Sequence, residues 1–196
     1  MNKIQTAEMI CLLDKSGSMY GKETDTIESY NHMLKKQKEL PGEAYITTVL
    51  FSDRLEILNL HTPVQNVEEL TDKEYFTEGN TALFDAIGKV LTQADRIISQ
   101  YSESSTPRVL VFIITDGAEN ASRDYSLPAV RSLLQKKQDA GWEILFFGTD
   151  PDILKTAQSI GIKKEHTFPY SMDSSGIRTS YQTAGLYFSR LRRKTE

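Results

Sequence analysis

The sequence has few of the residues that form disulfides or nitrogen- and sulfur-ligated metal sites: among 196 residues there are one cysteine and three histidines. A single cysteine excludes an intramolecular disulfide, and Cys11 lies inside an apolar run, so we expect a small buried core residue. His32, His61 and His166 stand on different segments without metal-ligand spacing. Each is interpreted as a surface residue or as one whose hydrogen bonds are satisfied within the fold.

Long hydrophobic runs and an excess of positive charge are also absent. No stretch approaches the ~20 apolar residues of a membrane span, and the apolar run at residues 9–13 is shorter than a signal-peptide core. We therefore expect a cytoplasmic location and no membrane partner. The net charge of −4 provides no positive stripe for nucleic acid. The one basic cluster, residues 190–194, favours a cationic last turn of a helix over a binding tail.

The rest of the composition is that of an ordinary globular chain, with 39% hydrophobic and 26% charged residues. A chain of this length suits one domain over residues 1–196 and buries about 70% of its unfolded surface on folding. No linker rich in Pro, Gly or Ser divides it, and no internal repeat is present. Nothing in the sequence indicates an oligomeric state.

Strand-length apolar runs recur along the chain. Residues 9–13, 109–115 and 144–147 are continuous and rich in branched or aromatic side chains, which is typical of parallel strands covered on both faces. Residues 44–52 and 54–61 alternate more and are separated by little more than Asp53. They predict an antiparallel hairpin near a sheet edge.

Helix-period segments alternate with these strands. Residues 83–98 carry apolar side chains at spacings of three and four, which predicts a helix with one broad apolar face. Four other segments are predicted to be helical: 23–40, 126–140, 152–160 and 174–192. Gly141 and Gly161 follow two of them as C-caps. The alternation predicts an α/β fold, a doubly wound, Rossmann-like, mostly parallel sheet with one antiparallel edge strand and helices on both faces.

Oxygen-bearing side chains collect where these strands end. Asp14 ends the first strand, Asp116 ends the run at 109–115, and Thr81 immediately precedes the strongest helix, so all three belong at the carboxyl edge of the sheet, where such folds bind ligands. Ser16 and Ser18 add two hydroxyls. Five oxygen donors without nitrogen or sulfur suit Mg²⁺ or Mn²⁺.

The three segments that carry these residues resemble a known site. D-K-S-G-S at 14–18, G-N-T-A-L-F-D at 79–85 and I-T-D-G at 114–117 are similar to the three parts of the metal-ion-dependent adhesion site of von Willebrand factor A domains, in the same order. Asn80 stands where a glycine is often found in that family. F-F-G-T-D-P-D at 146–152 also resembles the later part of small stand-alone bacterial A domains.

The resemblance implies a role for each position. Ser16, Ser18 and Thr81 would bind the metal through their hydroxyls, and Asp14 and Asp116 would act directly or through water. Because neutral hydroxyls leave the cation under-neutralised, an Asp or Glu of a partner protein could complete its coordination. The implied function is a metal-dependent protein-binding module that is not an enzyme, with Mg²⁺ or Mn²⁺ as its cofactor.

Neighbouring residues have supporting or undecided roles. Gly17 would let the loop fold tightly around the ion, and Gly117 would let the backbone leave its strand without a Cβ clash. Glu119 and Asn120 either border the metal or the partner, or belong to a solvated loop. Asp85, one helical turn after Thr81, is interpreted as a structural carboxylate at a helix N-terminus.

Other interpretations of the same residues stay open. Serine, threonine and aspartate also cap helices and form turns. Taken alone, D-x-S-x-S favours an ordinary turn, Thr81 could be a helix N-cap, and Asp116 with Gly117 could be a turn. Only their joint occurrence favours a site. A Mg²⁺-dependent phosphatase or phosphotransferase would use Asp14 as its nucleophile. Enzymes resembling the haloacid dehalogenase family, however, have a second aspartate where this chain has Ser16. No phosphate-binding glycine loop or nucleophile elbow is present. The third alternative is a scaffold with a vestigial metal site.

Overall fold

A six-stranded sheet forms the centre of the computed structural model, which describes residues 6–193. Its strand order is β3-β2-β1-β4-β5-β6, and all neighbours are parallel except β2 and β3. The strands are β1 (Ala7–Asp14), β2 (Ala44–Phe51), β3 (Leu55–Pro63), β4 (Arg108–Thr115), β5 (Glu143–Gly148) and β6 (Thr167–Pro169). The predicted mostly parallel sheet with one antiparallel edge strand is confirmed.

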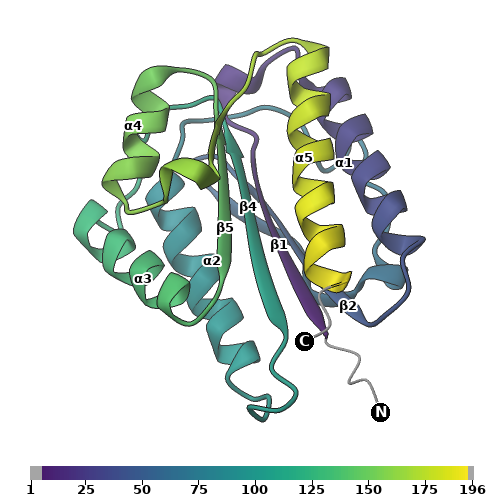
Figure 1. The fold of residues 1–196 in the computed structure, drawn as a ribbon. Helices are drawn as coiled ribbons and strands as arrows, with labels where there is room; N and C mark the ends of the chain where they lie inside the picture. The colour runs from purple at the N-terminus through teal and green to yellow at the C-terminus, as the bar shows by residue number, and fades with distance from the viewer. Residues whose placement is uncertain (1–5, 194–196) are drawn as a thin grey trace.

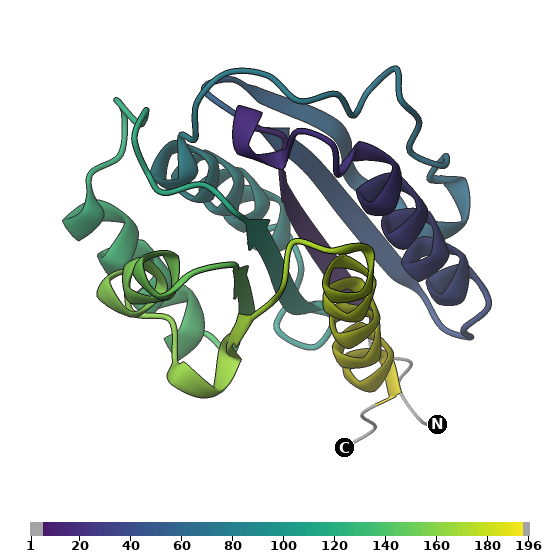
Figure 2. The same ribbon diagram turned by 90° about the horizontal axis from the view of Figure 1, so that it is seen from above.

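Helices cover both faces of this sheet (Figure 1). They are α1 (Glu23–Lys38), α2 (Leu83–Ile98), α3 (Leu127–Asp139), α4 (Pro151–Ser159) and α5 (Ser174–Arg193), with short 3₁₀ turns at Gly17–Met19, Val64–Asn66 and Lys164–His166. Seen from above, α1 and α5 lie on one side of the sheet and α2, α3 and α4 on the other (Figure 2). Within residues 6–193, none of the helices combines the length and apolarity that crossing a membrane requires.

The central strand β1 shows why the strand sequences lack polar alternation. Met9, Cys11 and Leu13 pack into the core beneath α1 and α5, while Ile10 and Leu12 pack into the core beneath α2. Both faces of the strand are therefore buried, and both need apolar side chains. Cys11 is fully buried, as expected, and this burial raises the pKa of its thiol far above the usual range, so it behaves as a core residue.

The sequence predicted one edge of the sheet but not the other. The predicted hairpin is present as β2 and β3, with irregular register near Thr48. The other edge strand, β6, pairs in parallel with β5 and was not predicted. It has only three residues, which is too short for a period of two to be recognised.

Two helices end as the glycine positions predicted. Gly141 and Gly161 have φ values of 85° and 89°, in the left-handed region that glycine adopts without strain. After α3, the Trp142 amide donates to the Lys137 carbonyl at 3.0 Å; after α4, the Ile162 amide donates to the Ala157 carbonyl at 3.0 Å. These bonds satisfy carbonyls that the helix ends leave open.

The basic cluster forms the last turn of α5, with Arg190, Arg192 and Arg193 in it; Lys194 lies outside the described residues. The Arg192 guanidinium also reaches the carboxyl end of the neighbouring helix α1. It donates to the carbonyl of Gln37 at 2.5 Å and to the carbonyls of Leu40 and Gly42 at 2.9 Å each. One cation thus binds the last turn of α1 and the loop that follows it, and ties α5 to both.

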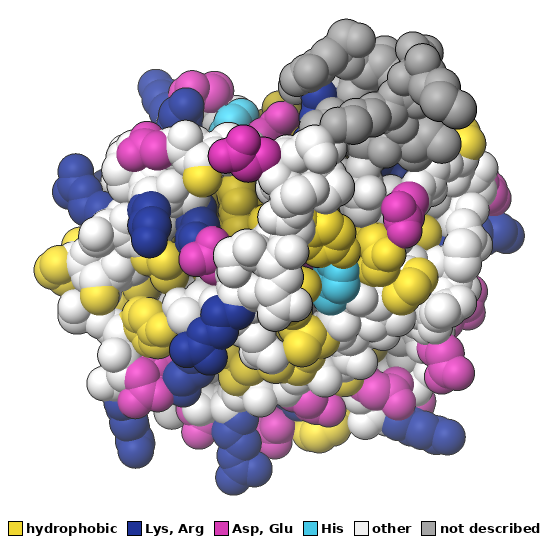
Figure 3. All heavy atoms as spheres, turned by 90° about the horizontal axis from the view of Figure 1, so that it is seen from below, with side chains coloured by type: hydrophobic (Ala, Val, Ile, Leu, Met, Phe, Trp, Pro, Cys, Tyr) yellow, Lys and Arg dark blue, Asp and Glu magenta, His cyan; other side chains and the backbone are white. Residues whose placement is uncertain are grey.

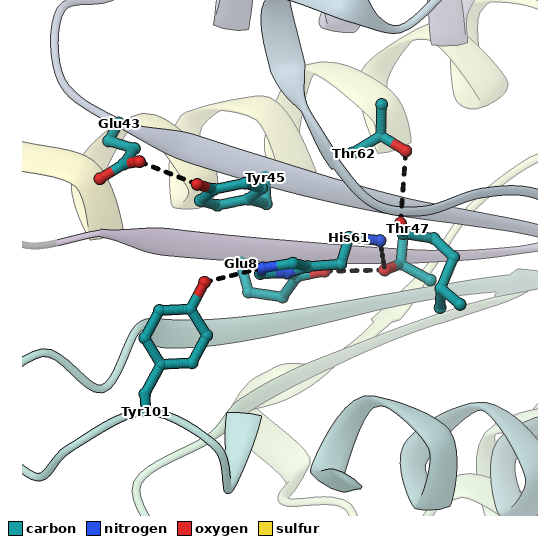
Figure 4. Close-up of polar contacts among 8 residues, drawn as sticks. Glu8, Glu43, Tyr45, Thr47, His61, Thr62 and Tyr101 are labelled. Atoms are coloured by element: carbon teal, nitrogen blue, oxygen red, sulfur yellow. Dashed lines mark hydrogen bonds and ion pairs between the residues drawn. The ribbon is translucent and has the colours of Figure 1, made fainter. Parts of the chain in front are cut away.

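The amino ends of the strands carry a buried polar network (Figure 4). The Glu8 carboxylate is 1% exposed. It accepts a hydrogen bond from the Thr47 hydroxyl at 2.7 Å and lies 2.6 Å from His61 Nδ1. His61 Nε2 lies 2.8 Å from the Tyr101 hydroxyl, and the ring stacks on Tyr45 with centroids 4.1 Å apart. The interpretation of His61 as a histidine satisfied within the fold is confirmed.

The surface at the amino ends of the strands carries positive and negative side chains side by side. Viewed from below, Lys and Arg side chains are interspersed with Asp and Glu around smaller apolar areas (Figure 3). The oxygen-rich residues singled out in the sequence lie at the other end of the sheet, where the parallel strands finish.

Candidate metal centre

The loop after β1 begins the site. Asp14 is the last residue of β1, and its Oδ1 accepts the backbone amide of Ser16 at 2.7 Å. The chain then turns into the 3₁₀ segment Gly17–Met19, in which the Met19 amide donates to the Ser16 carbonyl at 2.9 Å. This turn directs the Ser16 and Ser18 hydroxyls to the same side, with their Oγ atoms 3.1 Å apart.

Side chains from two distant segments complete the cluster. Thr81, just before α2, donates from Oγ1 to Ser16 Oγ at 3.0 Å, and Ser18 Oγ donates to Asp116 Oδ1 at 2.5 Å. The structure therefore brings together all five predicted residues, in one connected group of hydroxyls and carboxylates. That they bind a metal stays a prediction.

Two glycines allow the segments to approach this closely. The Gly17 amide donates to the Gly79 carbonyl at 3.0 Å, which holds the serine loop against the segment that carries Thr81. A Cβ at Gly117 would lie 2.1 Å from Thr81 Oγ1 and 3.3 Å from Ser16 Oγ. Both expected glycine roles fit the geometry, since a side chain at residue 117 would occupy the place of two candidate ligands.

Replacing Gly117 by alanine is expected to weaken Mg²⁺ binding by about 10- to 100-fold, because the methyl group must displace Thr81. Isothermal titration calorimetry with Mg²⁺ measures the loss. Gly185→Ala in α5 is the matched control: its Cβ would approach Met33 Cγ no closer than 3.2 Å, far from the site. Equal Mg²⁺ affinity in the two variants would contradict the assignment of Thr81 and Ser16.

Burial divides the cluster into a floor and an open side. Asp14 and Ser16 are 1% exposed and Thr81 is 2% exposed, whereas Ser18 is exposed and Asp116 is half-buried. A ligand can therefore approach only from the side of Ser18 and Asp116. This arrangement is suited to a cation held from below with one face towards solvent.

Burial disfavours the charged form of both carboxyl groups when no cation is bound. Burial raises the pKa of Asp14 to about 6, although hydrogen bonds from Thr115 and Ser16 oppose the shift, and the nearby Asp116 adds to it. Burial also raises the pKa of Asp116, against the hydrogen bond from Ser18. A bound divalent cation would favour the charged form of both groups and so relieve the cost of burying them.

Two residues that position the loop were not predicted. Thr115 donates from Oγ1 to Asp14 Oδ2 at 2.5 Å, so both oxygens of Asp14 are held. The Lys15 ammonium, with a side chain 2% exposed, pairs with Glu56 at 3.1 Å and Glu78 at 3.2 Å. The signal for Thr115 was its place directly before Asp116 at the end of an apolar strand. No local signal identifies the partners of Lys15.

The residues left undecided now have definite contacts. Asn120 Oδ1 accepts the Thr81 amide at 2.9 Å, so Asn120 borders the site. Glu119 instead accepts the Phe84 amide at 2.8 Å, at the start of α2, which favours a carboxylate. Asp85 accepts three backbone amides, from residues 123–125, and its interpretation as structural is confirmed.

The donor set fits a hard cation. Within residues 6–193 no group of three or more His, Cys, Asp or Glu side chains gathers to hold a metal, so any ion here must rely on the three hydroxyls together with two carboxylates. His32 is exposed and His166 packs edge-on against Tyr187. Oxygen donors alone suit Mg²⁺ or Mn²⁺ better than metals that prefer imidazole or thiolate.

The open α/β sheet, with D-x-S-x-S, a threonine and an aspartate at its carboxyl edge, places the chain in the class of A-type α/β domains. The sequence profile of the von Willebrand factor type A domain matches residues 8–183, and the chain belongs to this family. Such domains commonly mediate protein interactions and bind a divalent metal at this position of the fold. A comparison with curated proteins found no match.

Solved structures share the fold at low sequence identity. The pilus adhesin SpaC of Lactobacillus rhamnosus GG aligns with a TM-score of 0.72 and 11% identity over 96% of this chain and 30% of its own. The vWF domain of the pilus tip protein Mfa5 of Porphyromonas gingivalis aligns with a TM-score of 0.71 and 11% identity over 98% of both chains.

A third structure contains a metal. Proximal thread matrix protein 1 of the mussel byssus, with its metal-ion-dependent adhesion site occupied by zinc, aligns with a TM-score of 0.64 and 14% identity over 92% of this chain and 47% of its own. This chain thus spans about a third of SpaC and about half of the mussel protein.

Proposed function

We propose that this domain binds a divalent cation through Asp14, Ser16, Ser18, Thr81 and Asp116 and uses it to bind an acidic residue of a partner protein. The observation that carries the proposal is the convergence of these five side chains from three segments. Three of them form a buried floor and two face solvent. Members of the family that mediate adhesion make protein binding the function to test first.

The open coordination position, not an excess of positive charge, is what lets a carboxylate of a partner bind the metal. Two carboxylates neutralise a divalent cation only if both are ionised, and the three hydroxyls add no charge. Mg²⁺ takes six ligands and often keeps water. A site with one face open therefore leaves room for a partner Asp or Glu to replace a water on the metal. This step needs no catalytic residue of the domain.

An exposed aromatic side chain lies beside the open face. Tyr20 is 81% exposed, and its amide donates to the Gly17 carbonyl at 3.2 Å, two residues after Ser18. Tyrosine is enriched at protein interfaces, because it combines apolar area with a hydroxyl group. Tyr20 is a contact that a partner held at the metal would meet next.

The donor chemistry favours Mg²⁺ or Mn²⁺ as the ion, and the zinc-containing mussel structure makes Zn²⁺ the competitor to test. Titrating the metal-free protein with Mg²⁺, Mn²⁺ and Zn²⁺ in turn compares its affinities for the three ions. Binding of Zn²⁺ alone would reject Mg²⁺ and Mn²⁺ as cofactors. The cytoplasmic location expected from the sequence is retained as part of the proposal, and cell fractionation tests it.

The phosphatase alternative gains no support from the geometry. Asp14 is 1% exposed, and each of its oxygens accepts a hydrogen bond, from Ser16 or from Thr115. A nucleophilic carboxylate must reach the phosphorus atom of its substrate. Metal-dependent hydrolysis of generic phosphoesters that Asp14→Asn abolishes would nevertheless establish the enzyme and overturn the binding proposal.

A random peptide library displayed on phage tests the binding function directly. We expect selection on the wild-type domain in Mg²⁺, with elution by EDTA, to enrich peptides that contain Asp or Glu. The Asp116→Ala domain, selected in parallel, should give no such enrichment, since its metal site has lost one of its two carboxylates. Peptides that remain bound in EDTA, or that show no excess of acidic residues, would contradict the proposal. A vestigial site would show neither metal binding nor enrichment.

A further inference from the structure

A polar cavity of about 500 Å³ lies next to the segment that carries Thr81. Asn80, the residue before Thr81, lines it together with Asn120, whose side chain accepts the Thr81 amide. The cavity and the metal site are therefore neighbours, joined by Asn120 and by the chain at residues 80–81. Consecutive Cα atoms are ~3.8 Å apart, so one bound peptide can reach both places.

Most of the charged groups that line the cavity already have partners. Asp85 accepts the backbone amides of residues 123–125, and Asp124 pairs with Lys89 at 2.5 Å. The groups left over are the guanidinium groups of Arg54 and Arg123 and the carboxylate of Asp53.

The two arginines give the cavity its available positive charge. Both are exposed, and within residues 6–193 neither guanidinium forms an ion pair. The charged side chains of the lining sum to zero, because Asp53, Asp85 and Asp124 balance Arg54, Lys89 and Arg123. The two guanidinium groups are nevertheless the cations of the lining that are not engaged in an ion pair among the described residues. The exposed amide of Asn80 can also donate to a ligand. Guanidinium groups are the side chains best matched to a carboxylate, which they bind through paired N–H donors.

We propose that Arg54 and Arg123, with Asn80, form a second carboxylate subsite, so that the partner is an acidic segment with two carboxylates rather than one. The first binds the metal and the second enters the cavity. Asn80 of the cavity directly precedes Thr81 of the cluster, and an extended peptide spans about 3.5 Å per residue. The proposal therefore places the two acidic residues within about four residues of each other. This inference rests on the proposed function and specifies its ligand.

The peptide selection described above provides the test when it is repeated on Arg54→Ala/Arg123→Ala. The matched control is Arg96→Ala/Arg131→Ala, which removes the same charge from two exposed arginines in α2 and α3, away from the cavity. On wild type and control, we expect enrichment of a second acidic residue within about four positions of the first. On the cavity variant only the first acidic residue should remain enriched.

Affinities of synthetic peptides make the comparison quantitative. By fluorescence polarisation in Mg²⁺, the two-acid peptide should bind the cavity variant about three- to tenfold more weakly than wild type, and its one-acid analogue should change less than about twofold. If one-acid peptides bind in Mg²⁺ but a second acid adds nothing, or adds equally in the cavity variant, the subsite is overturned and the proposed function stands. If no acidic peptide needs the metal, the proposed function fails as well.

Discussion

Asp14→Ala and Asp116→Ala are each expected to lower Mg²⁺ affinity by more than about 100-fold. Removing a residue that only supports a metal ligand costs 10- to 100-fold, and these two are the only carboxylates in the cluster. In each variant, the one remaining carboxylate would be the only negative charge next to the ion, together with three neutral hydroxyls. Calorimetric titration of metal-free protein measures the effect.

The control for this experiment is Asp72→Ala, which removes an exposed carboxylate from the loop before α2. It changes the net charge equally but leaves the cluster intact, so its Mg²⁺ affinity should equal that of wild type. Both site variants should remain folded, since each loses a buried carboxyl group that is costly to ionise. Identical Mg²⁺ affinity in all four proteins would disprove the assignment of the metal centre.

The stability of the metal-free protein should fall as pH rises from about 4 to about 6. Burial raises the pKa of Asp14 from 3.8 to about 6, so across this window the folded state binds a proton that the unfolded state has released. Stability is therefore greatest below the unfolded pKa and is lost as pH rises through the folded pKa. A shift of this size corresponds to about 3 kcal/mol of unfolding free energy.

Urea unfolding in EDTA at several pH values measures this effect, with Asp14→Asn as the comparison because asparagine does not titrate. The variant should keep only the pH dependence that arises from other groups, including Asp116. In saturating Mg²⁺ the wild type should behave in the opposite way, since the metal competes with the proton and binds more tightly above about pH 6. Parallel pH profiles for the two metal-free proteins would contradict the shift at Asp14.

The core of the site was predictable because each of its parts is local. An apolar run that stops at Asp14 or Asp116 marks a strand end, and the right-handed winding of a parallel sheet brings such ends to one edge. Thr81 is marked in the same way by the periodic helix that follows it. The strands and helices that support these ends were predicted for the same reason, with bounds that differ by a few residues.

Contacts set by register and by distant loops were not predictable. Lys15 is buried because Glu56 of β3 and Glu78 of the loop before α2 meet its ammonium, and neither partner is indicated by the residues around Lys15. The short strand β6 exists only through its pairing with β5. The cavity that Arg54 and Arg123 line is formed by segments that are far apart in the sequence. Each of these features depends on which segments the finished fold places together.

Strand β1 begins, and helix α5 ends, at the lower edge of the molecule in Figure 1, whereas the oxygen cluster lies at the upper edge. A fluorophore, a surface linkage or a neighbouring module that is attached before β1 or after α5 would therefore lie at the edge of the sheet opposite to the cation. Biosensor chips coated through such a linkage should present every immobilised copy with its binding face towards the flowing sample.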